Sequence, residues 1–298
     1  MTVPATDTPT RRVIGLLSLR RRSIAVRLAV SAFFRSNSPV QVGHLIASET
    51  NYLAPGDQAA EAALAGAVAT GSGFYLSGIT ASADLPGGAV ACMGDSITDG
   101  LDSSQDAERR WPDRLAERLL AATHGRVGAI DAGLTGNALL QGERVSVVGE
   151  SGLARLSRDV LGRPGVRWLI LFEGINDIIY PPDAGDTAAE LIAAYGQAIA
   201  RAHAAGVKVF GATLTPLAGA GPPYYSPVKE AQRQRVNAWI RGSGAFDAVF
   251  DFDAAVRTPG EVPRIRPAFD GGDHLHLNDA GYAALAAAIP LGAILRGN

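Results

Sequence analysis

From residue 89 onward, the chain alternates short apolar segments with longer amphipathic ones. The short segments predict strands at residues 89–93, 127–130, 166–172, 207–213 and 248–252. The longer segments predict helices at residues 111–123, 151–161, 187–205, 227–240 and 279–295. Strands that regularly alternate with helices form a parallel sheet, because each helix must cross a face of the sheet to return the chain. We therefore predict a five-stranded parallel sheet covered by helices on both faces.

The first 88 residues differ from the rest in charge and pattern. Residues 1–48 hold seven arginines and one acid, a net charge of +6, so the other 250 residues carry −8 within a total of −2. Residues 1–22 are interpreted as a disordered basic leader. Residues 23–88 are interpreted as a β-rich accessory segment with strand patterns at 24–30, 40–45 and 73–80. Residues 58–72 fit either a helix or a loop.

The leader has a faint likeness to an export signal. Thr10-Arg11-Arg12 precedes an apolar stretch, but Arg20-Arg21-Arg22 interrupts that stretch before it reaches the length of a signal-peptide core. Residues 283–295 are apolar but contain Pro290 and are too few to cross a bilayer. We predict no membrane span, and the sequence by itself favours a cytoplasmic location.

Composition excludes several classes of protein. With 47% hydrophobic and 19% charged residues, the chain can bury a large core and is not wholly disordered. Its balanced charge argues against a dedicated nucleic-acid binder. The single cysteine, Cys92, permits neither an intrachain disulfide nor a cysteine-based zinc site and is expected to be an inert core residue.

Polar and glycine-rich clusters follow the predicted strands, at residues 94–100, 131–137 and 173–177, and another precedes the last helix, at 270–278. Ligands of open parallel sheets bind at the carboxyl ends of the strands. In these clusters Ser96 is a candidate nucleophile, His276 a candidate general base, and Asp273 the carboxylate that would orient the imidazole. The backbone N–H groups of Ser96 and Gly136 and the side-chain amide of Asn176 are candidate oxyanion donors.

These clusters resemble the four sequence blocks of the SGNH (GDSL-type) hydrolases, in the family's order: Gly94-Asp95-Ser96-Ile97, Gly136, Gly174-Ile175-Asn176-Asp177 and Asp273-His274-Leu275-His276. The resemblance covers residues 89–298 and implies a flavodoxin-like α/β/α catalytic domain. It implies a triad of Ser96, Asp273 and His276, with Ser96, Gly136 and Asn176 forming the oxyanion hole. It further implies ester hydrolysis through an acyl-serine intermediate, with no metal and no organic cofactor.

The resemblance also narrows the substrate and leaves alternatives. Many members of the family act on short-chain esters or acetylated sugars, and this chain shows no long apolar lid segment. We expect a small-molecule or carbohydrate ester with a short, acetyl-like acyl group. The alternatives are a lipase or thioesterase for longer acyl chains and a non-catalytic carbohydrate-binding module of the same fold. The alcohol part and the oligomeric state stay open, and the resemblance adds secretion as an alternative location.

Several local alternatives accompany this interpretation. Leu277 stands where the family often has proline, and Gly133 could replace Gly136 as an oxyanion donor. His274 and His276 have a spacing that is familiar in metal sites, but no third histidine lies nearby in the sequence. Two further sets of residues have structural or binding interpretations: Asp95 and Asp177, expected to hydrogen-bond loop backbone, and Tyr180, Tyr224 and Tyr225, expected either to contact substrate or to pack their loops.

Overall fold

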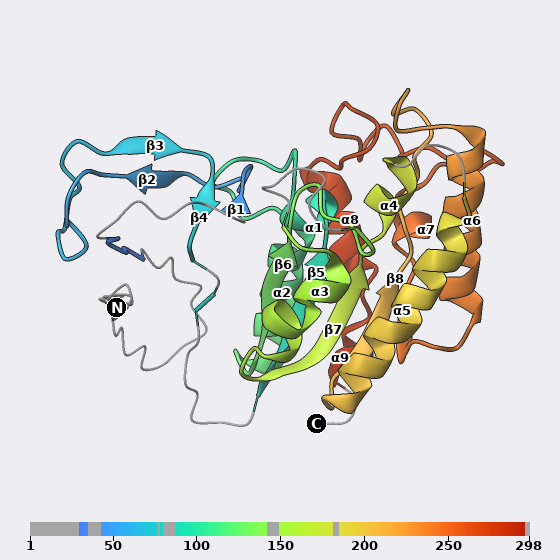
Figure 1. Ribbon diagram of the computed structural model, residues 1–298, viewed down its shortest axis with the longest axis horizontal. Coiled ribbons are helices and arrows are strands. Elements are labelled where there is room, and N and C mark those ends of the chain that lie inside the picture. The colour runs from blue at the N-terminus through green and yellow to red at the C-terminus, as the bar shows by residue number, and fades with distance from the viewer. Residues whose placement is uncertain are drawn as a thin grey trace, which may run out of the picture.

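The computed structural model describes residues 30–34, 43–76, 78–79, 87–141, 149–180 and 185–295 of the chain. Its main body is a five-stranded sheet with the order β6-β5-β7-β8-β9, and all neighbouring strands are parallel (Figure 1). The strands are β5 (Gly88–Gly94), β6 (Val127–Gly133), β7 (Val166–Phe172), β8 (Lys208–Ala212) and β9 (Ala248–Phe250). This order is that of flavodoxin-like sheets, so the predicted fold class is confirmed.

Helices cover both faces of this sheet. They comprise the short helix α3 (Gly152–Leu156) and the longer helices α2 (Trp111–Thr123), α5 (Thr187–Ala204), α6 (Pro227–Gly242) and α8 (Asp279–Ala287). Helix α2 packs against α8, while α5 packs against both α3 and α6. Right-handed crossovers in this strand order place the α2–α8 pair on one face and α3, α5 and α6 on the other. The other short helices are α1 (Ser96–Asp99), α4 (Ile175–Ile179), α7 (Phe252–Val256), α9 (Leu291–Leu295) and the π-helix η1 (Ser157–Leu161).

Three predicted elements differ from the observed ones in their ends or their geometry. The predicted closing helix, 279–295, is divided into α8 and α9, because Pro290 lies between them and has no N–H for a continuous helix. The predicted strand 248–252 ends at Phe250, since the Asp251 side chain accepts a hydrogen bond from the Ala254 N–H and caps α7. The predicted helix 151–161 changes from α to π geometry at Ser157.

The accessory segment forms two small antiparallel sheets. Strand β1 (Gly43–His44) pairs with β4 (Gly73–Phe74), and β2 (Asn51–Leu53) pairs with β3 (Val68–Thr70). In Figure 1 the β2–β3 hairpin projects away from the main sheet. Strands β1 and β4 fall within the predicted strand patterns 40–45 and 73–80. The expectation of a helix or a loop at 58–72 is wrong for residues 68–70, which form β3 and pair with β2. The predicted leader, 1–22, lies outside the described residues, as do residues 24–29 of the first strand pattern.

The core lies between the sheet and its helices. Cys92 is fully buried in β5, as predicted. Trp111, Phe172 and Phe252 form an aromatic cluster in which the Phe252 ring centroid lies 5.4 Å from that of Trp111 and 5.0 Å from that of Phe172. This cluster joins α2 and α7 to the end of the central strand β7. Among the described residues, no helix has the length and apolar character needed to cross a lipid bilayer.

Candidate active site

Ser96 lies at the sharp turn where strand β5 passes into helix α1. Asp95 is the residue that caps this helix, since its side chain accepts a hydrogen bond from the N–H of Ile97 at 3.0 Å. The turn requires glycine at position 94, because a Cβ there would lie 2.1 Å from the Thr98 hydroxyl oxygen. Ser96 is therefore the first residue of the helix rather than its cap.

The structure brings Ser96, His276 and Asp273 into one line of hydrogen bonds. The His276 Nε2 lies 2.8 Å from the Ser96 Oγ, although these residues are 180 positions apart in the sequence. The His276 Nδ1 lies 2.5 Å from the Asp273 carboxylate, which also accepts hydrogen bonds from the backbone N–H groups of Leu275 and His276. Ser96 and His276 are buried, and Asp273 lies at the surface of the same loop.

The environment of Asp273 favours its charged form. Partial burial would raise the pKa of this carboxyl, but hydrogen bonds from the His276 ring and from two backbone N–H groups outweigh that effect. The pKa of Asp273 is therefore held well below its ordinary value. An ionised Asp273 fixes the Nδ1 proton of the imidazole and leaves Nε2 as the acceptor that faces Ser96.

The candidate oxyanion donors meet in the same pocket. Ser96, Gly136 and Asn176 all line a pocket of 280 Å³ that also contains His276 and Asp273. Gly136 has a left-handed backbone with φ +81°. Asn176 is in the first turn of α4, and its Nδ2 donates a 2.7 Å hydrogen bond to the Asn137 carbonyl. Since that carbonyl directly follows Gly136, the hydrogen bond holds two of the candidate donors side by side.

Gly133, the alternative oxyanion donor, is not among the residues that line this pocket. It ends strand β6 and pairs with Gly94 of β5, so it belongs to the sheet and not to the loop beyond it. A Cβ at Gly133 would lie 2.2 Å from the Asp99 nitrogen, which explains why glycine is needed there. Strand β6 also includes Asp131, which the sequence placed in the loop after the strand.

The acidic residues beside the candidate catalytic groups hold loop backbone, as predicted. The Asp177 carboxylate accepts hydrogen bonds from the N–H groups of Leu139 and Leu140 at 2.8 and 3.0 Å. Helix α4, which contains Asp177, is thereby attached to the loop that follows Gly136. The Asp95 carboxylate likewise accepts a backbone hydrogen bond, from the Ile97 N–H at the start of α1. Burial raises the pKa of Asp95 to about 7, against the lowering effect of its hydrogen bond from Ile97.

Sequence reasoning missed a buried ion pair beneath the site. Arg155 of α3 is 1% exposed and donates to the Glu173 carboxylate at 2.9 Å. The same guanidinium donates to the carbonyls of Gly94 and Ala132 and to the Asn137 side chain, at 2.7 to 2.9 Å. It therefore connects the ends of three strands. Burial raises the pKa of Glu173, and the charge and hydrogen bond of Arg155 oppose this rise.

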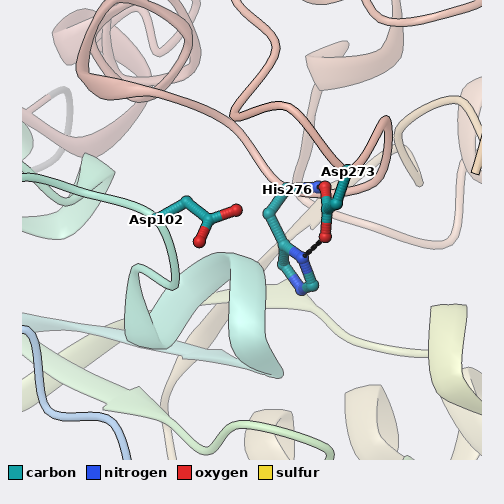
Figure 2. A group of neighbouring side chains, drawn as sticks. All are labelled: Asp102, Asp273 and His276. Atoms are coloured by element: carbon teal, nitrogen blue, oxygen red, sulfur yellow. Dashed lines mark hydrogen bonds and ion pairs between the residues drawn. The ribbon is translucent and has the colours of Figure 1, made fainter.

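A second carboxylate faces the loop that holds Asp273 and His276. Figure 2 shows Asp102, which lies in the loop after α1, directed toward His276 and Asp273. Ligand atoms of these three residues lie within 4.8 Å of one another, a spacing that could hold a metal ion. Both nitrogens of His276 already contact Ser96 and Asp273, so a metal bound there would compete with the hydrogen-bond line. Asp102 lies just beyond the polar cluster 94–100 that follows the first predicted strand, and this closeness is the one sequence signal that points to it.

The remaining candidates are His274 and the three loop tyrosines. His274 is exposed, and its Nδ1 lies 2.6 Å from the Asp270 carboxylate, so it does not join His276 in a metal site. Tyr180 and Tyr224 line the pocket, with ring centroids 6.4 Å apart, whereas Tyr225 is not among the residues that line it. Two of the three tyrosines are thus placed where they can contact a ligand.

Comparison with known proteins decides the family. The chain matches the model of the GDSL-like Lipase/Acylhydrolase family over residues 92–284. It belongs to this family. As a GDSL-type acylhydrolase it is a hydrolase of ester bonds, which confirms the enzyme class and the family resemblance. A search of curated proteins gave no match.

Solved structures of GDSL-type enzymes and other esterases have the same fold. A carbohydrate acetylesterase family member from Sinorhizobium meliloti is 18% identical with a TM-score of 0.56, over 70% of this chain and 97% of that one. The lipase/acylhydrolase from Enterococcus faecalis is 22% identical with a TM-score of 0.52, over 67% and 92%. The aryl esterase from M. smegmatis is 18% identical with a TM-score of 0.51, over 67% and 95%.

Proposed function

We propose that this GDSL-type hydrolase is a serine esterase that cleaves short-chain, acetyl-like carboxylic esters through an acyl-serine intermediate. The observation that carries the proposal is the continuous line of hydrogen bonds from Ser96 through His276 to Asp273, which opens into a small pocket. A serine hydroxyl is a weak nucleophile until a base within hydrogen-bond distance accepts its proton. The 2.8 Å separation between Ser96 Oγ and His276 Nε2 supports that transfer.

The first half of the reaction acylates the serine. Ser96 Oγ attacks the acyl carbon while His276 Nε2 takes the hydroxyl proton, and Asp273 stabilises the imidazolium that forms. The tetrahedral intermediate then collapses: the bond from the acyl carbon to the alcohol oxygen breaks, and His276 returns the proton to that oxygen. In the second half, water attacks the acyl carbon while His276 takes a proton from it. The bond from the acyl carbon to Ser96 Oγ then breaks, His276 returns the proton to Oγ, and the acid product leaves.

The oxyanion is held by donors that are already in place. The backbone N–H groups of Ser96 and Gly136 and the side-chain amide of Asn176 would share the negative charge that develops on the carbonyl oxygen. The hydrogen bond from Asn176 to the Asn137 carbonyl supports this role, because it orients the amide before substrate arrives. Donors that need no reorganisation lower the barrier most effectively.

The size and lining of the pocket support a short acyl group. Its 280 Å³ is at the lower end of the roughly 300–1,000 Å³ common for ligand pockets. Ile179 and Leu275 supply apolar surface, and Tyr180 and Tyr224 offer rings on which a sugar could stack. The fold shared with a carbohydrate acetylesterase family member supports carbohydrate esters as candidate substrates.

The test is a hydrolysis profile over aryl esters from acetyl to palmitoyl, extended to acetylated xylan and pectin fragments. We expect the highest kcat/KM at the shortest acyl groups, since longer chains exceed the pocket. An optimum at long chains would instead support a lipase or thioesterase. Oligosaccharide binding without turnover of any ester would support a binding module.

The assignment of the nucleophile has its own test. Ser96→Ala should lower kcat by about 10⁴-fold or more while the unfolding transition stays unchanged. The control is Ser243→Ala, which changes a serine at the end of α6, outside the pocket. Near-normal activity of the Ser96 variant would refute the proposed mechanism.

A further inference from the structure

The accessory segment contacts the stretch of the catalytic domain that follows Ser96 in the sequence. The Nδ1 of His44 lies 2.7 Å from Oδ1 of Asp99, and Ser48 Oγ donates to the Gly100 carbonyl at 3.1 Å. Further along, the N–H and hydroxyl of Thr50 donate to the Asp106 carboxylate at 2.6 and 2.7 Å. All these contacts are made with residues 99–106, the stretch that continues from the helical turn begun by Ser96.

Asp99 connects the accessory segment to the oxyanion loop. It is the last residue of α1, and it is 1% exposed. While Oδ1 faces His44, Oδ2 accepts hydrogen bonds from the N–H and the hydroxyl of Thr135 at 2.9 and 2.7 Å. Thr135 lines the pocket and directly precedes Gly136. One carboxylate therefore joins His44, the helix of the nucleophile and the loop of a candidate oxyanion donor.

The contact between His44 and Asp99 is well supported on both sides. A buried carboxylate is stable when donors satisfy both of its oxygens, and His44 supplies the donor for Oδ1. His44 is itself held by strand pairing, opposite Gly73 in the β1–β4 sheet. The hydrogen bond to Asp99 raises the pKa of His44 above its ordinary value, against the effect of burial. Protonation would make the contact a charge-assisted hydrogen bond.

We propose that His44 is a positioning residue of the active site, which acts through Asp99 to hold the Thr135–Gly136 loop in its oxyanion-binding conformation. The inference rests on the proposed function of Ser96 and Gly136. Loss of His44 would leave Asp99 Oδ1 without this donor and allow the carboxylate to rotate, which would loosen its two hydrogen bonds to Thr135. Because oxyanion donors act most strongly in the transition state, the effect belongs in kcat and not in KM.

The test compares two substitutions of the same residue on an aryl acetate. His44→Ala should lower kcat about 10- to 100-fold with KM within about twofold, because a small displacement of a catalytic group has effects of this size. His44→Asn should keep most of the activity, since its Nδ2 can donate from close to the position of the imidazole Nδ1. Wild-type kcat in His44→Ala, or equal losses in both variants, would overturn the proposal.

A matched control separates this role from general docking of the segment. Thr50→Ala removes the hydroxyl hydrogen bond between the same segment and Asp106, away from the oxyanion loop, and should leave kcat unchanged. If it lowers kcat as much as His44→Ala, the specific path through Asp99 is wrong. Unfolding in urea is measured for every variant. If His44→Ala does not fold, His44→Leu, which fills the space without donating, takes its place with the same expected loss.

The same experiments distinguish failure of this inference from failure of the proposed function. An inactive Ser96→Ala together with a fully active His44→Ala would overturn only the role of His44. An active Ser96→Ala would overturn the serine mechanism, whatever the His44 variants show.

Discussion

The guanidinium of Arg155 lies 2.9 Å from the Glu173 carboxylate, and both side chains are buried beneath the active edge of the sheet. The same guanidinium reaches the Gly94 carbonyl, two residues before Ser96, and the Asn137 side chain, directly after Gly136. The buried pair thus supports the turn at Ser96 and the loop that holds Gly136 together. Removing Arg155 would leave the Glu173 carboxyl and the Gly94 and Ala132 carbonyls without their buried donor.

We therefore expect Arg155→Met to lower the free energy of unfolding by about 3–5 kcal/mol. Arg158→Met is the control, because Arg158 is 52% exposed and its ion pair with Glu150 lies at the surface. Surface pairs contribute about 0–1 kcal/mol. Urea unfolding of both variants measures the difference, and equal losses would contradict a supporting role for the buried pair.

A comparison of two buried asparagines tests the oxyanion hole. Asn176→Ala should lower kcat about 10²- to 10³-fold, the usual effect of removing one oxyanion donor. Asn237 is equally enclosed, but its amide bonds the backbone of Leu214 and lies outside the pocket. Asn237→Ala should cost about 1–3 kcal/mol of stability with kcat of the folded enzyme unchanged. A kcat loss in Asn237→Ala that matches Asn176→Ala would remove the support for an oxyanion role.

The hydrogen bond between Ser96 and His276 predicts that their substitutions are not additive. Once the nucleophile is absent, removal of the base that activates it lowers kcat little further. Ser96→Ala, His276→Ala and the double variant should therefore have similar residual kcat values, each about 10⁴-fold or more below wild type. Single-turnover assays on an aryl acetate measure all three. Losses that multiply in the double variant would show that the two residues act independently.

Asp131 should make stability depend on pH. Burial raises the pKa of Asp131 to about 7, Arg110 lowers it, and Oδ2 of Asp131 has no hydrogen-bond partner. The folded protein therefore holds this proton more tightly than the unfolded chain, where the pKa is ~3.9. The contribution of Asp131 to the free energy of unfolding therefore falls as the pH rises from about 4 to 7, and it stays constant above pH 7.

Asp131→Asn removes this dependence while its Oδ1 can still accept the Gly133 N–H. At pH 8 the variant should be more stable than wild type by roughly 2–4 kcal/mol, and below pH 4 the two should be similar. Urea unfolding across this pH range measures the difference. The exposed Asp57→Asn variant controls for loss of one surface charge. A constant difference at every pH would contradict the titration of Asp131.

Local pattern was sufficient for much of the fold. Strand Val166–Phe172 and helix Trp111–Thr123 have the bounds predicted from their apolar runs, because an unbroken apolar segment and a helical spacing are properties of neighbouring residues. Strand β6 continues to Gly133, beyond the predicted end at residue 130, since Asp131 to Gly133 pair with β5. Pairing with a neighbouring strand can extend β structure through residues whose own pattern favours a loop.

The sequence by itself determined the family, the parallel sheet and the residue types at its active edge, because strand ends and reactive side chains can be recognised locally. It also predicted Ser96, Asp273 and His276 as site residues, and the structure brings them into hydrogen-bond contact. Only the tertiary structure decided that Arg155 lies under Glu173 and that His44 meets Asp99. Those contacts join residues 18 and 55 positions apart, and burial between packed elements, not local pattern, selects such partners.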